Sequence, residues 1–175
     1  SKMTLKTLTT IAVSLLMSVG SALAADIQIE QQYARAASPV AKSGAAFMHI
    51  MNKGVEDDTL IAVRTDAAVM PELHTHIMED GVAKMREVEG GFPVLAGDAT
   101  ILQRGGLHIM LMGLTAPLIQ GDVITLTLIF EHAGEIVIEV PVDYDRQEPM
   151  GMEMNMDNSM DHSTMPMNMG STESN

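Results

Sequence analysis

The stretch Asp122–His132, DVITLTLIFEH, decides the fold class because its side chains alternate in character. Successive side chains of a β-strand point to opposite faces, so the stretch divides into two rows. One row holds Val123, Thr125, Thr127 and Ile129, and the other holds Ile124, Leu126, Leu128 and Phe130. The second row is entirely apolar, which is typical of a strand that covers a core on one side.

Similar short apolar or alternating runs fill the sequence from about residue 27 to residue 142. Nine runs are strand candidates: IQIEQQYAR, GAAFMHIMN, TLIAVRTD, ELHTHIM, VAKMREV, ATILQ, LHIMLMGL, DVITLTLIFEH and EIVIEVPV. Glycine-containing turn signals separate several of them, including Glu79-Asp80-Gly81 and Gly105-Gly106. There is no long amphipathic helical pattern. Many short strands at this spacing predict an all-β antiparallel sandwich.

The first 24 residues are predicted to be a secretory signal peptide. Lys2 and Lys6 precede the apolar run Ile11–Gly20, and Ala22-Leu23-Ala24 forms a small-residue cleavage site. The run is short for a membrane span, which is the alternative interpretation. We therefore expect cleavage before Ala25, no membrane span in the mature chain, and export to the periplasm or the extracellular space, of which the periplasm is preferred.

The composition changes at about residue 143, after which branched aliphatic residues disappear. Residues 143–175 are predicted to be a disordered tail, because they cannot bury enough apolar surface to offset their ordering entropy. Eight of the twenty residues in MGMEMNMDNSMDHSTMPMNM (150–169) are methionine, and polar residues separate them. Thioether is a soft ligand that selects Cu(I). The candidate tail ligands are Met150, Met152, Met154, Met156, Met160, His162, Met165, Met167 and Met169.

Composition and charge exclude several classes of function. The chain has 17 methionines and no cysteine, so disulfides, thiolate nucleophiles and a blue-copper electron-transfer centre are excluded. The net charge of −13 argues against nucleic acid and anionic lipid surfaces as partners. Because the sequence has no nucleophile elbow, HExxH or phosphate-binding glycine loop, we do not expect an enzyme.

Soft ligands also gather in the middle of the chain, between residues 72 and 114. In ELHTHIM, His74, His76 and Met78 share one strand face, and the following Asp-Gly turn leads into a strand that carries Met85. In LHIMLMGL, the three side chains on one face are His108, Met110 and Met112.

Two imidazoles and two thioethers, from His74, Met85, His108 and Met110, make a plausible four-coordinate Cu(I) site. The same set suits Zn, Mg or Ca poorly, because those ions favour harder ligands or thiolate. Whether His76 or Met112 replaces one of these ligands stays open at this point. The remaining candidates are better explained by packing or solvation: His49, His132, Met48, Met51 and Met70.

These residues resemble the motif of the periplasmic copper chaperone family called PCu(A)C. That motif is His, ten residues, Met, about twenty-one residues, and His-x-Met. Here ten residues separate His74 from Met85, and twenty-two separate Met85 from His108. The extra residue is expected in the loop around GGFPVLAGD. The flanking text ELH, DGV and HIMLMGL is also similar, and the resemblance covers roughly residues 36–142.

The resemblance implies a cupredoxin-like or Ig-like Greek-key sandwich over residues 25–142 that carries Cu(I). It implies delivery to the CuA centre of cytochrome c oxidase subunit II, beside a Sco-type thiol protein. It also implies a second copper site in the tail, which is a candidate for Cu(II) through His162. We expect a monomer. The alternatives are a periplasmic copper storage or resistance protein, and an adhesion or assembly module that binds metal incidentally.

Overall fold

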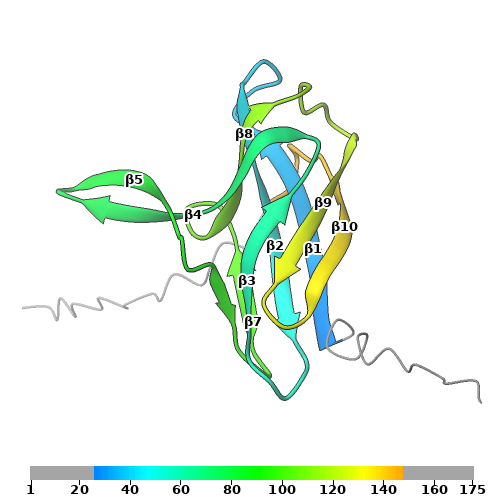
Figure 1. The fold of residues 1–175 in the computed structure, drawn as a ribbon. Helices are drawn as coiled ribbons and strands as arrows, with labels where there is room; N and C mark the ends of the chain where they lie inside the picture. The colour runs from blue at the N-terminus through cyan, green and yellow to red at the C-terminus, as the bar shows by residue number, and fades with distance from the viewer. Residues whose placement is uncertain (1–25, 148–175) are drawn as a thin grey trace, which may run out of the picture.

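The computed structural model describes residues 26–147, and every regular element in them is a strand, as predicted (Figure 1). The strands are β1 (Ile27–Ala36), β2 (Ser43–Asn52), β3 (Asp58–Arg64), β4 (Ala68–Glu79), β5 (Val82–Glu87), β6 (Phe92–Val94), β7 (Ala99–Leu102), β8 (His108–Leu114), β9 (Val123–Phe130) and β10 (Gly134–Pro141). Over this range, no helix has the length and apolar character needed to cross a membrane.

The strands form two sheets that pack face to face. One sheet has six strands in the order β1-β2-β8-β4-β5, with β7 pairing beside β2, and the other has the order β10-β9-β3-β6. Every strand-to-strand ladder is antiparallel. β8 joins β2 and β4 although it follows both in sequence, so the sheet is built by crossovers between the layers. The predicted antiparallel sandwich is confirmed.

The apolar row of β9 fills the core between the sheets, as its alternation predicts. Leu126 and Leu128 are fully buried and Phe130 is 2% exposed, whereas Val123 on the opposite face is 57% exposed. Large side chains of the six-stranded sheet meet them from the other side, including Met48, Ile50, Ile109 and Leu111. Burial of apolar surface on this scale is the main favourable term in folding.

One strand, β6, lies where the sequence predicts a loop. Its three residues are too few to show alternation, and Pro93 in their centre argues against a strand. Phe92 and Val94 are nevertheless buried, and β6 pairs with the edge of β3. Gly91, with a φ of 78°, sets the direction of the chain just before it.

A buried carboxylate ties the β9–β10 turn to the start of β3. Asp58 accepts hydrogen bonds from the backbone N–H groups of Thr59, His132 and Ala133 at 2.8–2.9 Å. These bonds satisfy donors that no strand ladder would otherwise pair. The imidazole of His132 itself is about half exposed, in agreement with its assignment as a solvated residue.

The packed part of the chain continues past residue 142, where the predicted domain ends. The Tyr144 hydroxyl donates a hydrogen bond to the Leu118 carbonyl at 2.7 Å. The Arg146 guanidinium lies over the Tyr33 ring, 5.1 Å from its centroid. The predicted signal peptide, its cleavage site and all nine candidate tail ligands lie outside the described residues.

The β4–β5 hairpin extends away from the body of the sandwich (Figure 1). Its turn is the predicted Asp80-Gly81 pair, and both residues have positive φ, of 52° and 77°. This conformation matches the right-handed twist of the flanking strands and requires residues such as Asp and Gly. The turn fixes the register of the hairpin, so that His76 lies opposite Met85.

Candidate metal centre

Strand register brings the predicted ligands together on the outer face of the six-stranded sheet. His74 of β4 lies opposite His108 of β8, while His76 lies opposite Met85 of β5. Met110 follows His108 by two residues and shares its face. Directly opposed or diagonal side chains on one face are within reach of each other. The hairpin and β8 therefore form a single cluster of imidazole and thioether groups.

The three imidazoles of this cluster are close neighbours. The centroid of the His108 ring lies 5.8 Å from that of His74 and 5.2 Å from that of His76. His76 meets His108 edge-on, and the Phe47 ring lies 6.3 Å from His108 on the other side. His108 is therefore the centre of the cluster, in contact with both histidines of β4.

An open cavity of about 1100 Å³ lies over this face. Three of the four predicted ligands line it, namely Met85, His108 and Met110, and His76 lines it with them. His74 lies next to this cavity without lining it, and its side chain is only 12% exposed. The structure thus gathers all four predicted residues but adds His76 to the cavity wall.

His74 is held by a neighbouring carboxylate. Its Nε2 lies 2.7 Å from Oε2 of Glu72, two residues earlier on the same face of β4. Its Nδ1 is buried and has no hydrogen-bond partner in the described structure. A buried ring nitrogen without a partner is costly unless it serves another purpose. With the proton on Nε2, the lone pair of Nδ1 is available to a metal ion, and the Glu72 contact fixes that tautomer.

His108 is oriented in the complementary way. Its Nδ1 donates a hydrogen bond to the Gly106 carbonyl at 3.0 Å, which leaves the lone pair on Nε2. Burial lowers the pKa of His108 below its ordinary value of 6.5, and the nearby His76 and His74 lower it further, although the Gly106 bond opposes this. The ring is therefore neutral near pH 7 and ready to bind a metal.

The donor set of the cluster selects for soft metals. Among residues 26–147, no three His, Asp or Glu side chains are arranged so that they could hold a metal ion by themselves. Besides its imidazoles, this face carries the thioethers of Met85 and Met110, which are soft donors. Met85 is 55% exposed at the outer edge of the sheet, whereas Met110 is partly buried beside it. Met85 is therefore the candidate ligand that a partner protein could approach most easily.

The other soft side chains lie outside the cluster. Met112 shares the face of Met110 and lies opposite Met70 in the β4–β8 ladder, two residues beyond the pair of Glu72 and Met110. Neither Met112 nor Met70 lines the cavity. Met70 is half exposed, so its side chain packs only in part. Met48 is buried, in agreement with its assignment as core filler. His49 lies near the other end of β2, where it pairs with β1 and β7.

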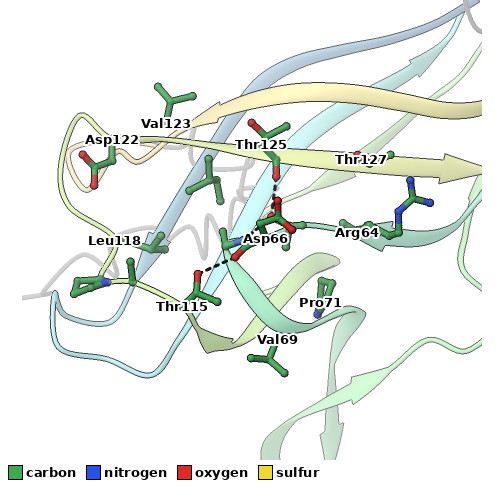
Figure 2. A pocket seen from close by; sticks show the side chains of 16 residues that line it. Arg64, Asp66, Val69, Pro71, Thr115, Leu118, Asp122, Val123, Thr125 and Thr127 are labelled. Atoms are coloured by element: carbon green, nitrogen blue, oxygen red, sulfur yellow. Dashed lines mark hydrogen bonds between the residues drawn. The ribbon is translucent and has the colours of Figure 1, made fainter.

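A second cavity, of about 830 Å³, lies between β3, the start of β4 and β9 (Figure 2). Its wall contains hydroxyl, carboxylate and aliphatic groups, such as Thr125, Asp66 and Val69, and none of its lining residues is His or Met. Its polar groups are used within the fold, since Thr115 donates to the Asp66 carbonyl at 2.8 Å. Of these two cavities, only the one at β4, β5 and β8 is lined by imidazole and thioether groups.

Sequence reasoning missed the role of Glu72, although its flanking motif ELH was visible. A carboxylate two residues from a histidine shares its strand face. That spacing could have identified Glu72 as a partner of His74. It does not by itself distinguish such a partner from a solvated charge.

Replacing Glu72 by alanine should weaken Cu(I) binding by about 10- to 100-fold, because loss of the carboxylate frees the His74 ring and its tautomer. Replacement by glutamine, which can still accept from Nε2, should recover much of the affinity. The measurement is competition against a Cu(I) chelator. Glu87→Ala, which removes the same charge from the neighbouring β5 strand, is the control. An equal loss in Glu87→Ala would mean that charge, not ring orientation, is responsible.

Comparison with known proteins places the chain in a family. The family model described as "Putative lipoprotein LpqE-like" matches residues 27–142. The "Putative lipoprotein Lxx21020" of Leifsonia xyli subsp. xyli is 36% identical over 118 residues, which cover 66% of this chain and 69% of that protein.

Solved structures show the same fold. The solution structure of CuI-DR1885 from Deinococcus radiodurans is 30% identical, with a TM-score of 0.55, over 74% of this chain and 87% of that one. The copper-bound PCuAC domain from PmoF2 is 22% identical, with a TM-score of 0.56, over 67% of this chain and 92% of that one. The predicted similarity to PCu(A)C proteins is thus confirmed at the level of the fold. The chain belongs to the LpqE-like family, and its residues 26–147 have the fold of a PCuAC domain.

Proposed function

We propose that this protein is a copper metallochaperone that binds Cu(I) through His74, Met85, His108 and Met110. The observation that carries the proposal is the convergence of imidazole and thioether groups at one open cavity. Neither ligand type brings negative charge, and both are soft or borderline donors that suit Cu(I). The unpartnered Nδ1 of His74 supports the same assignment, because a metal ion would satisfy it.

Two relatives support copper as the cargo. The Deinococcus radiodurans structure was solved with Cu(I), and that protein is 30% identical to this chain. The PmoF2 domain, also solved with copper, shares the fold at lower identity. The copper is carried rather than used for catalysis, so we propose a binding protein without turnover.

The exposed position of Met85 fits a carrier that hands its ion on. An acceptor could replace Met85 first, because this ligand lies on the edge strand of the protruding hairpin (Figure 1). We propose the CuA centre of cytochrome c oxidase subunit II as the acceptor, with a Sco-type thiol protein acting beside it. The LpqE-like family is described as lipoproteins, which supports action outside the cytoplasm, in the periplasm.

The methionine-rich segment 150–169 is proposed as a second copper site that feeds the first. The described chain ends beside the cavity, since Arg146 and Gln147 line it. A tethered donor at this place would deliver copper at a high effective concentration. Periplasmic copper storage is the second candidate function, because the tail holds eight methionines and could itself be the main reservoir.

Titration with Cu(I) against a competing chelator tests the proposal. The full chain should be compared with a chain that ends at Gln147, which retains all ten described strands. The structural match to the PmoF2 domain covers 92% of that domain. We expect one tight equivalent in the short chain and more in the full chain. Loss of all tight binding on truncation would contradict the chaperone site and favour storage by the tail.

A further inference from the structure

We propose that His76 is an additional ligand of the copper site, which exchanges with His74 on the bound ion. The inference rests on the proposed function and extends it. At any moment the ion would be held by His108, Met85, Met110 and one of the two histidines of β4. The first evidence is position, because His76 lines the cavity together with Met85, His108 and Met110, whereas His74 does not.

The spacing of the rings supports shared coordination. A metal–nitrogen bond of about 2 Å puts the ion roughly 3 Å from the ring centroid. Two imidazoles on one tetrahedral ion then have centroids roughly 5 Å apart. The separation of His76 from His108 is 5.2 Å, and that of His74 from His108 is 5.8 Å. Both pairs fit, and the pair that includes His76 fits more closely.

Strand pairing also favours His76 as the partner of the exposed thioether. His76 lies directly opposite Met85 in the β4–β5 ladder, whereas His74 lies opposite Glu87. Directly opposed side chains are closer than diagonal ones. A coordination set that contains Met85 is therefore reached more readily from His76 than from His74.

The two histidines differ in how firmly they are held. The Nε2 of His74 contacts Glu72 at 2.7 Å, and the side chain is nearly buried. His76 stands two residues further along β4, toward the hairpin turn, on the wall of the open cavity. His74 would thus retain the ion at the inner end of the site, and His76 would hold it at the outer end. An ion moving from His74 to His76 approaches Met85 and the surface without losing contact with His108.

The test combines affinity with a residue-specific signal. Cu(I) affinity is measured for His74→Ala, His76→Ala and the double variant, in the chain that ends at Gln147. Exchange predicts that each single variant loses about tenfold or less, because the other histidine replaces the missing one. The double variant should lose about 1000-fold or more, far beyond the sum of the two single effects. His49→Ala, on β2 of the same sheet, is the matched control and should bind like the unaltered protein.

Ring ¹⁵N spectra of the full chain provide the second measurement. On addition of one equivalent of Cu(I), ring nitrogen signals of His74, His76 and His108 should all shift, while those of His49 should not. The proposal is overturned if His76→Ala has no effect alone or together with His74→Ala, and if the His76 signals do not move. If those results were obtained while the unaltered chain still bound Cu(I) tightly, the proposed function would hold and only the role of His76 would be rejected. Failure of the unaltered chain to bind Cu(I) would instead reject the proposed function.

Discussion

Replacing Met85 and Met110 together by leucine should abolish tight Cu(I) binding by the chain that ends at Gln147. Leucine keeps the size and apolar character of the side chain but removes the sulfur. Because Met85 is mostly exposed and Met110 only partly buried, the protein should remain folded. The variant therefore separates the loss of a ligand from a loss of structure.

The size of the effect follows from the free energy of metal binding by four-ligand sites. Four-ligand structural zinc sites bind their ion with about 10–16 kcal/mol, or roughly 3 kcal/mol for each ligand, and we take this as the scale for the copper site. Each methionine should therefore contribute about 100-fold in affinity, and the pair about 10,000-fold. Competition against a Cu(I) chelator measures this directly, with the melting temperature recorded in parallel.

Met51→Leu is the control for the methionine pair. Met51 is a partly buried methionine of the same sheet, but it pairs with β1 and β7 at the other end of β2. Its replacement should leave Cu(I) affinity unchanged. If the double variant at Met85 and Met110 also kept its affinity, the thioethers would not be ligands and the copper site would have to lie elsewhere.

The largest effect on stability is expected from Gly91→Ala. Gly91 has a φ of 78°, which an L-residue adopts only at a cost of about 1–2 kcal/mol. A methyl group there would also collide with the Leu60 carbonyl oxygen and lie 3.1 Å from the Ile61 Cα. Both obstacles belong to the backbone of β3, so relief requires that β6 move away from it. We expect a loss of about 4 kcal/mol or more in the free energy of unfolding.

Gly97→Ala separates the two causes. Gly97 has a similar φ of 72°, but a methyl group there would meet nothing within 4 Å. It should cost only about 1–2 kcal/mol, the strain of the backbone conformation. Chemical denaturation of both variants makes the comparison. Equal losses at the two positions would show that the contact between Gly91 and β3 is unimportant for the fold.

Much of the sandwich could be predicted from local pattern alone. The alternation in DVITLTLIFEH identified the buried face of β9, and the Asp80-Gly81 pair identified the hairpin turn. Both signals are local, because they depend on side-chain period and on the conformations that a turn demands. β6 was not predictable in this way, since its burial depends on its pairing with β3, which is distant in sequence.

The candidate site was predictable in its members but not in its internal arrangement. Spacing placed His108 and Met110 on one face, and their co-occurrence with His74 and Met85 gave the predicted set, which also matches the motif of PCu(A)C proteins. Whether these residues bind copper stays a prediction. The contact of Glu72 with His74, and the approach of His76 to His108, depend on side-chain orientation and on strand register. The approach of His76 to His108 emerges only when β4 and β8 are placed side by side, whereas the contact of Glu72 with His74 lies within β4.

X-ray absorption at the copper edge reports directly whether imidazole nitrogen and thioether sulfur bind the ion. The sample is the chain that ends at Gln147, loaded with one equivalent of Cu(I). A site made of His and Met side chains should give a mixed first shell of imidazole nitrogen and thioether sulfur. The sulfur contribution should be lost in the double variant at Met85 and Met110. A first shell of nitrogen and oxygen alone, unchanged in that variant, would contradict a His/Met copper site on the outer face of the six-stranded sheet.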